Sequence, residues 1–495
     1  KNSIYNSSGV LIGNIAGIIL TIILARLLLP ELFGVYHLAL AVGFLLLTFT
    51  DLGINKTLIR YVAYALGRND ETLARSYFVY LVKMKLFLSL LISISIFLFA
   101  EPVAFHVFHK PSLFLPLKII AVFTFLQSLL SFTNNAFAAF QEFKYNTIRA
   151  SVYEGLRLIL IPLFVLLGFS VYGALVGFCL SILGAFLILF YFLVKKHAFL
   201  FKGEVKRIDR KRILMFLSFL TIGSISATVF AYVDSIMLGI FMAVEYVGFY
   251  RASYTIVLAI AGLASIGGVL FPVFTQLEGS DLNNAFQKVF KYSTILSFPF
   301  AFGLAFIAEP LVKAIYGVEY LPAIYPLYVL SFLIIITPSD FFSTVFNAKE
   351  KPEYPTMVVI ISMILNVILN YFLILRFGII GAAVATVISR YFNFISIGIL
   401  SKRVLNIFPA SSSIYKPLFS SLVMVLFLYF IPAPSTILAG IGGIFIATFI
   451  YIFIMFLIRG IEKEDIKYLS LIVGQQEKLI RAYNVMNSKL QRGGK

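Results

Sequence analysis

The chain has 495 residues, of which 61% are hydrophobic and only 13% are charged. A soluble globular protein is about half apolar and about a quarter charged, so this composition excludes a water-soluble fold and predicts an all-α protein that spans a membrane several times. The net charge of +18 would suggest a nucleic-acid partner in a soluble protein, but the positions of the charges favour membrane lipids over nucleic acid.

Hydropathy along the chain predicts about fourteen membrane-spanning helices, each long enough for the ~20 residues that a bilayer requires. Several predicted spans exceed that length and are expected to tilt or to project beyond the bilayer. The predicted spans, in chain order, are 7–29, 34–64, 77–101, 112–140, 146–168, 171–194, 213–241, 246–275, 290–309, 322–347, 354–375, 378–401, 414–431 and 436–458.

The segment from Lys195 to Arg212 is the longest polar connection inside the bundle, and it predicts a boundary between two lobes. We expect a first lobe of six helices in 1–195, a basic linker in 196–212, and a second lobe of six helices in 213–405. Two further helices are expected in 406–460, and an amphipathic tail in 461–495.

An internal repeat supports this division into two lobes. Glu31-Leu-Phe-Gly34-Val-Tyr36 recurs as Glu245-Tyr-Val-Gly248-Phe-Tyr250, each time at the turn that follows the first helix of a lobe. An even number of helices in each copy makes the two copies parallel. Parallel repeats of this kind place a substrate between two lobes that rock to give alternating access.

The distribution of Lys and Arg predicts the orientation of the chain in the membrane. If the N-terminus is cytoplasmic, the cytoplasmic segments hold thirty Lys and Arg residues, whereas the outer turns hold only Lys110, Lys313 and Arg376. We therefore expect a cell-membrane protein with both termini in the cytoplasm.

The ordered succession of short motifs resembles a known family. In the second lobe these motifs are Asp234-Ser-Ile-Met-Leu-Gly239, Glu245 to Tyr250, Leu270-Phe-Pro272, Ile315-Tyr-Gly317, Asn366-Val-Ile-Leu-Asn370 and Phe377-Gly378-Ile-Ile-Gly381. In the first lobe they are Ala25-Arg26, Pro30-Glu31, Phe33-Gly34 and Asp51-Leu-Gly53 ahead of Arg60. Over about residues 5–405 the chain is similar to the polysaccharide-export flippases, whose superfamily also contains lipid II flippases and multidrug extruders.

This resemblance implies two six-helix lobes in a V around a central cavity, with two extra helices. It also implies a substrate, a sugar or oligosaccharide linked to a polyprenyl phosphate or pyrophosphate. The expected partners are this glycan, the membrane lipids, and the polymerase or glycosyltransferase machinery of glycan assembly. We expect a monomer that is not an enzyme, because the sequence offers no catalytic constellation and no nucleotide-binding loop.

Charged residues inside predicted spans are costly and usually functional. The four acids there are Asp51, Glu154, Asp234 and Asp340; the seven bases are Arg26, Lys83, Lys85, Lys118, Arg157, Arg251 and Arg390. This basic excess predicts a cavity for an anion, and five of the bases are our candidates for contacting phosphate. These five are Arg26, Lys83, Arg157, Arg251 and Arg390.

Four of these candidates also have a structural interpretation. Arg26, Lys83 and Arg251 could extend to the membrane interface, and Arg157 could be neutralised by Glu154, three residues earlier. Arg26 and Arg251 could instead pair with Asp234, whereas Arg390 has no near partner in the sequence. Asp51 and Arg60 are interpreted as a structural or gating clamp at the cytoplasmic end of the second helix.

A second polar cluster is a candidate for ion coupling. Asp234, Asn366, Asn370 and Thr386 offer hard oxygen ligands, and the two asparagines share one helix face. The resemblance to lipid II flippases implies a sodium site on these helices, although those proteins carry an acid where this chain has Asn370. No cofactor is expected apart from a Na⁺ or H⁺ ion here, and the alternative is that the asparagines only hydrogen-bond helices together.

The sequence thus predicts a flippase that moves a lipid-linked glycan from the cytoplasmic to the outer leaflet for cell-surface glycan assembly. The alternative is a multidrug or small-molecule extruder of the same fold, whose cavity should be acidic or neutral rather than basic.

Overall fold

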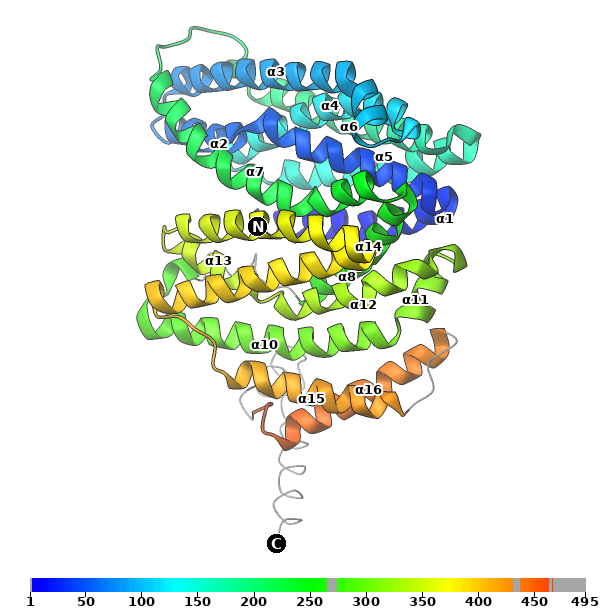
Figure 1. Ribbon diagram of the computed structural model, residues 1–495. Coiled ribbons are helices and arrows are strands. Elements are labelled where there is room, and N and C mark those ends of the chain that lie inside the picture. The colour runs from blue at the N-terminus through cyan, green and yellow to red at the C-terminus, as the bar shows by residue number, and fades with distance from the viewer. Residues whose placement is uncertain (1, 265–273, 431–436, 463–464, 466–495) are drawn as a thin grey trace.

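The computed structural model describes residues 2–264, 274–430, 437–462 and 465, and every regular element in them is helical. The part of the predicted tail in 466–495 lies outside the described residues. Among the described residues, eleven helical segments are long and apolar enough to cross a membrane, so the chain is a multi-pass membrane protein. A side view shows the long helices packed side by side, with their ends at the left and right (Figure 1).

Three of these segments, at 53 to 55 residues, are far too long for one crossing, because a helix rises about 1.5 Å per residue and the apolar core of a bilayer is about 30 Å thick. Each contains at least one residue with positive φ that breaks its helical path: Leu29 in the first segment, Gly168 in the second and Gly378 in the third. In Figure 1 the two halves of α14 (Glu353–Leu405) run as neighbouring rods that meet at the right. The total of about fourteen spans stays a prediction.

The helices have the following bounds. The first group is α1 (Asn2–Asp51), α2 (Ile54–Leu66), α3 (Glu71–Pro102), α4 (Phe114–Ala139), α5 (Lys144–Phe164) and α6 (Ser170–Lys196). The second group is α7 (Arg210–Phe241), α8 (Val244–Ala264), α10 (Gly279–Phe306), α11 (Ala308–Ile315), α12 (Ile324–Leu330), α13 (Ser339–Ala348) and α14. The last two helices are α15 (Ser412–Tyr429) and α16 (Ile437–Leu457).

Two predicted spans are interrupted in the structure. The span 34–64 breaks where Leu52 and Gly53 both have positive φ, which ends α1 and starts α2. The span 322–347 consists of α12 and α13 joined by a 3₁₀ segment, and Pro322, Pro326 and Pro338 lie along it. Proline lacks the N–H that a continuous helix needs, which explains the second interruption.

The first six helices lie together at the top of Figure 1, and α8 with α10 to α14 lie below them. α7 packs against both α1 and α14, and one hydrophobic core runs through residues of both groups. α15 and α16 lie at the bottom beside α10, with their own apolar cluster around Met424, Leu428 and Tyr451. This arrangement agrees with two lobes and two extra helices, while the exact lobe boundaries stay predictions.

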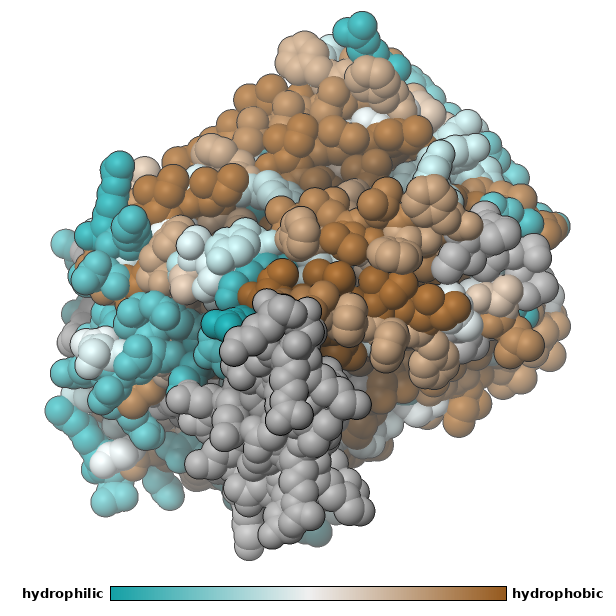
Figure 2. All heavy atoms as spheres, turned by 90° about the horizontal axis from the view of Figure 1, so that it is seen from below, coloured by the Kyte–Doolittle hydropathy of each residue, from teal (hydrophilic) through white to brown (hydrophobic). Residues whose placement is uncertain are grey.

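The surface is apolar where lipid would contact it. Figure 2 shows a broad brown band across the molecule, with the teal, hydrophilic side chains concentrated at the left. That left end carries the connection between α6 and α7 and the connection between α14 and α15 (Figure 1). Both connections were predicted to be cytoplasmic because they are rich in Lys and Arg.

The two copies of the internal repeat meet in space. A side-chain carbon on Gly34 would collide with the carbonyl oxygen of Val244, and one on Gly248 would collide with that of Pro30. α1 and α8 therefore touch backbone to backbone at this point, as small residues allow between membrane helices. The repeated glycine forms a seam between the two halves, which we call the glycine seam and define by Gly34 and Gly248.

Candidate functional site

A cavity of about 150 Å³ lies between the two groups of helices, next to the glycine seam. Its walls come from α1, α5 and α6 on one side and from α7 and α8 on the other. Most of the lining is aromatic or aliphatic, with two arginines among it. The lining residues are Leu20, Thr21, Leu24, Tyr36, His37, Leu40, Ala41, Phe44, Tyr153, Arg157, Phe178, Tyr232 and Arg251.

Two of the five predicted phosphate contacts, Arg157 and Arg251, meet in this central cavity. Arg157 comes from α5 and Arg251 from α8, so each half contributes one positive charge. The lining contains no Asp or Glu. The two arginines thus bring basic groups to the cavity from both halves, although Arg157 is paired with Glu154, which lies outside the lining.

Arg157 is held in place by its own helix and by aromatic rings. It forms a salt bridge of 3.3 Å with Glu154, so the neutralising pair that the spacing predicted is present. Its guanidinium lies 5.4 Å from the ring centre of Tyr153 and 5.5 Å from that of Phe178. Its side chain is 16% exposed, so the group is fixed in position but can still be reached from the cavity.

Arg251 has fewer anchors. Its guanidinium lies 5.5 Å from the ring centre of Tyr254, and the residue is partly buried. In the same lining, Tyr232 of α7 stacks on Phe44 of α1, with ring centres 5.4 Å apart and planes nearly parallel. This stack joins the two halves across the cavity and presents flat aromatic faces, which suit sugar rings as well as cations.

The other three predicted phosphate contacts lie elsewhere. Arg26 is exposed and donates to the carbonyl oxygens of Ala314 and Ile315, the latter at 2.8 Å, so it caps the end of α11. Lys83 lines a different pocket with the α6–α7 connection. Arg390 is partly buried, with its guanidinium 4.0 Å from the ring centre of Phe230.

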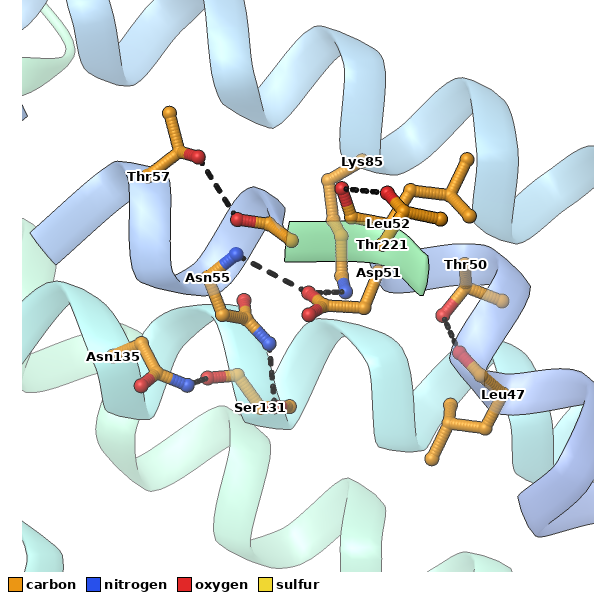
Figure 3. Close-up of polar contacts among 11 residues, drawn as sticks. Leu47, Thr50, Asp51, Leu52, Asn55, Thr57, Lys85, Ser131, Asn135 and Thr221 are labelled. Atoms are coloured by element: carbon orange, nitrogen blue, oxygen red, sulfur yellow. Dashed lines mark hydrogen bonds and ion pairs between the residues drawn. The ribbon is translucent and has the colours of Figure 1, made fainter. Parts of the chain in front are cut away.

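The break between α1 and α2 carries a polar network (Figure 3). Asp51, the last residue of α1, accepts a hydrogen bond from the backbone N–H of Asn55 at 3.2 Å and forms an ion pair with Lys85 of α3 at 2.9 Å. The hydroxyl of Thr221 from α7 donates to the carbonyl oxygen of Leu52 at 3.0 Å, which satisfies a backbone group that the break leaves without a helical partner. The network thus links the two halves.

The predicted clamp of Asp51 with Arg60 stays a prediction, and the structure adds Lys85 as a partner of Asp51. The recorded ion pair of Asp51 is with Lys85, whose side chain is only 1% exposed, and Arg60 lies exposed on α2. Sequence reasoning placed Lys85 among the membrane charges but gave it no role. Lys85 follows Lys83 by two residues and therefore lies on another face of α3. This spacing was the one sign in the sequence that the two lysines have different environments.

The second predicted cluster does come together around Asp234. Its carboxylate accepts hydrogen bonds from Asn370 at 2.6 Å, from the hydroxyl of Thr386 at 2.6 Å and from that of Tyr250 at 2.8 Å. Asn366 lies fully buried one turn away from Asn370. Tyr250 was not predicted here, although it ends the second copy of the repeat.

The amide groups of this cluster retain unused hydrogen-bonding capacity. The side-chain oxygen of Asn370 and both polar side-chain atoms of Asn366 are buried and have no hydrogen-bond partner among the described residues. Buried polar atoms without a partner are rare in folded proteins. Together with the Asp234 carboxylate, these oxygens fit a small hard cation such as Na⁺. The cluster has only one carboxylate, and nowhere within the described residues do three or more His, Cys, Asp or Glu form a group that could hold a metal ion.

A bundle of membrane-spanning helices with a central cavity between two halves is typical of a membrane transporter. Residues 1–278, more than half of the chain, match the family model described as "Polysaccharide biosynthesis protein". The chain belongs to this family.

The chain is also similar to individual proteins. An uncharacterized membrane protein of Methanocaldococcus jannaschii is 27% identical over 384 residues, which are 73% of this chain and 76% of that protein. A probable low-salt glycan biosynthesis flippase of Haloferax volcanii is 29% identical over 179 residues, which are 35% of this chain and 38% of that protein.

Solved structures establish the fold. The lipid II flippase MurJ in an inward closed conformation superposes with a TM-score of 0.75 at 16% identity, covering 92% of this chain and 98% of that one. An inward-facing multidrug transporter of the MATE family superposes with a TM-score of 0.61 at 18% identity, covering 82% and 100% of the two chains. The predicted fold class is therefore confirmed.

Proposed function

We propose that this chain is a flippase that moves a lipid-linked sugar or oligosaccharide from the cytoplasmic to the outer leaflet, for assembly of cell-surface glycans. The observation that carries this proposal is the central cavity, in which Arg157 and Arg251 face a common space from opposite halves. Family membership and the flippase relative support the same function.

The arrangement suits a phosphate-linked cargo for a physical reason. Arginine presents a planar fork of donors that matches phosphate oxygens, and it stays charged at any physiological pH. The aromatic rings of Tyr36, Tyr153 and Tyr232 line the same cavity and can stack on sugar faces. The polyprenyl chain would remain in the bilayer, outside the cavity.

The cavity must enlarge before it can hold such a cargo. Its volume of about 150 Å³ is below the ~300 Å³ at which small-molecule sites begin. Loading therefore requires the halves to separate, and because each half holds one of the two arginines, a bound phosphate would draw them together again. Alternating access follows if the loaded state closes on one side while the other side opens.

A transport assay tests this proposal directly. The protein is reconstituted in vesicles with a fluorescent polyprenyl-phosphate sugar, and the rate of leaflet exchange is measured. We expect Arg157→Gln and Arg251→Gln each to slow transport by about tenfold or more, because a charged hydrogen bond contributes about 1.5–3 kcal/mol. Unchanged exchange in both variants, with normal yield and melting temperature, would contradict the proposal.

Lys118→Gln is the matched control, because Lys118 lies between the rings of Phe97 and Phe114 and away from the cavity. A lipophilic cation serves as the second cargo and tests the alternative function of a multidrug extruder. The cavity lining has two arginines and no carboxylate, so we expect no cation transport.

We further propose that the Asp234 cluster couples transport to Na⁺ or H⁺. Asp234, Asn366, Asn370 and Thr386 would hold the ion, and its charge would compensate the buried carboxylate. α7 and α14 supply these residues and Tyr250 on α8 contacts them, so occupancy of the cluster would alter how these three helices pack.

The same vesicles test coupling with imposed Na⁺ or pH gradients. We expect one of the two gradients to accelerate exchange in the parent protein and to have no effect in Asp234→Asn. If both gradients leave the parent rate unchanged, the coupling proposal fails while the flippase proposal stands.

We also propose that the basic end of the molecule, which carries the α6–α7 connection, faces the cytoplasm in a cell membrane. The protein would act as a monomer beside the glycosyltransferase or polymerase enzymes of glycan assembly.

A further inference from the structure

A second basic pocket lies at the end of the bundle that carries the α6–α7 connection, and its volume is about 690 Å³. It is formed by the first turns of α3 and by the end of that connection, and it shares no lining residue with the central cavity. The lining residues are Ser76, Val79, Tyr80, Lys83, Val205, Lys206, Arg207, Ile208, Asp209 and Arg210. We call it the linker pocket.

The linker pocket has a fixed outer wall. The backbone N–H of Lys206 donates to the hydroxyl of Ser76 at 2.8 Å, and the Lys206 ammonium pairs with Asp70 at 2.7 Å. Beside these contacts, the guanidinium of Arg75 donates to the carbonyl oxygen of Glu204 at 3.4 Å. These contacts dock the connection onto α3, so the pocket is part of the folded structure.

The charge in the linker pocket is mostly positive. Four bases line it against the single carboxylate of Asp209, and the Lys206 charge is matched by Asp70 outside the lining. The remaining bases are Lys83, Arg207 and Arg210, all of them exposed. α7 also begins at Arg210, so the positive end of a 32-residue helix lies at the same wall.

The face of α3 that forms the pocket continues as a lipid-facing surface. Ser76, Tyr80 and Lys83 are spaced at helical intervals, and the same interval leads next to Phe87, Leu90 and Ile94. Phe87 is 66% exposed, Leu90 52% and Ile94 48%. A molecule in the pocket would therefore have bases around one end and an apolar helix surface along the other.

We propose that the linker pocket binds an anionic phospholipid of the surrounding membrane, with its phosphate among Lys83, Arg207 and Arg210 and its acyl chains along α3. The lipid would brace the connection between the two halves at the rim of the bilayer. This role is independent of cargo transport.

The test uses the full-length protein in detergent, titrated with phosphatidylglycerol or with zwitterionic phosphatidylcholine, and reads bound lipid by native mass spectrometry. We expect phosphatidylglycerol to bind in preference to phosphatidylcholine. Arg207→Gln combined with Arg210→Gln should weaken phosphatidylglycerol binding by about tenfold or more, since each base near a membrane surface contributes about 1 kcal/mol. The Lys206 contacts with Ser76 and Asp70 that dock the connection remain in this variant, and the only recorded contact to α3 that it removes is that of the Arg210 guanidinium with the Tyr80 ring at 5.6 Å.

The matched control is Lys202→Gln combined with Lys211→Gln. Both lysines are exposed in the same segment, but neither lines the pocket. We expect this control to bind phosphatidylglycerol within about twofold of the parent protein. Equal losses in the two double variants would show a diffuse attraction of the whole segment and would overturn the proposal.

Two further arms separate the sources of phosphate. Inorganic phosphate at the same concentration should not displace the lipid, because it lacks the chains that contact α3; full displacement would overturn the assignment to a lipid. A polyprenyl-phosphate sugar should compete less well than phosphatidylglycerol, and stronger competition by that sugar would reassign the pocket to the cargo.

Discussion

At the scale of single residues, the ion pair of Lys85 with Asp51 joins α3 to the break between α1 and α2. Lys85 is almost fully buried, whereas the Asp51 side chain is 28% exposed. Removing one partner of a buried pair leaves a charge without compensation, whereas replacing both partners with apolar residues is often harmless. A comparison of the single and the double replacement therefore distinguishes a stabilising ion pair from two side chains that contribute only by packing.

We predict that Lys85→Met lowers the free energy of unfolding by about 3 kcal/mol, because Asp51 then loses its countercharge. The double variant with Asp51→Leu should recover most of that loss. Thermal unfolding in detergent measures both effects, with Lys56→Met on the exposed face of α2 as control. Additive losses in the double variant would mean that the two residues do not act as a pair.

A second residue-scale prediction concerns Asp70, which lies outside the membrane-spanning segments. Hydrogen bonds from the Lys206 ammonium and from the backbone of Leu73 hold the pKa of the Asp70 carboxyl below its ordinary value. A lowered pKa means that the stabilisation is complete at neutral pH and is lost only as the pH falls through that lowered value.

We therefore predict that the α6–α7 connection stays docked from about pH 7.5 to about pH 5, since ordinary carboxyls titrate near pH 4. Hydrogen exchange at the amide of Lys206, corrected for intrinsic rates, reports the docking because this amide donates to Ser76. Asp70→Asn should raise the exchange rate already at neutral pH. Release of the parent connection near pH 6.5 would instead implicate a histidine.

The types of residue in the predicted spans indicated a cavity with basic residues, but they did not reveal the role of every charged residue. Arg157 and Arg251 could be predicted because arginines inside predicted spans need a wet or paired environment. The capping role of Arg26 could not, because its acceptors at Ala314 and Ile315 lie almost 300 residues away in sequence. Lys85 was missed for the same reason, since pairing depends on which helices become neighbours.

At the scale of helices, the glycine seam brings α1 and α8 into backbone contact. The repeat of Gly34 as Gly248 was visible in the sequence, yet nothing in the sequence showed that the two copies touch each other. The hydropathy pattern did not predict the interruption at Leu52 and Gly53. Leucine is apolar whatever its backbone conformation, so a positive φ at Leu52 leaves the hydropathy of the span unchanged.

We predict that Gly248→Ala forces α1 and α8 apart. The added methyl group would overlap the carbonyl oxygen of Pro30, and overpacking of this kind costs about 1–3 kcal/mol. Gly262→Ala on the same helix is the matched control, because a side-chain carbon there would meet no atom within 4 Å.

Spin labels on cysteines at Ser112 and Lys313, in a Cys179→Ala background, measure the separation between the two groups of helices. We expect Gly248→Ala to shift the distance distribution to longer values and Gly262→Ala to leave it unchanged. An unchanged distribution in both variants would show that the seam does not limit the approach of the halves.

At the scale of the whole molecule, contacts between the halves lie on both sides of the central cavity. On one side are the glycine seam, the hydrogen bond from Tyr320 to the carbonyl oxygen of Ala25 at 2.9 Å, and the cap that Arg26 forms on α11. On the other side, Thr48 bonds Thr228 at 2.9 Å and Thr221 bonds Leu52. Opening to either face must break one of these sets.

The orientation of the molecule is the last prediction. A single cysteine at Lys202 should react with a membrane-impermeant maleimide only in inverted vesicles, and one at Ser112 only in intact cells. Cys179→Ala provides the background, because Cys179 is the chain's single cysteine and is buried. The opposite labelling pattern would place the basic end outside and would reverse the proposed direction of transport.

The glycine seam also has a consequence for how such a carrier can diversify. Because backbone contacts backbone there, the seam sets the smallest separation that α1 and α8 can reach. Substitutions of side chains elsewhere do not change this separation. Residues around the central cavity are thus free to change and to suit a different sugar, while the closest approach of the two halves stays the same.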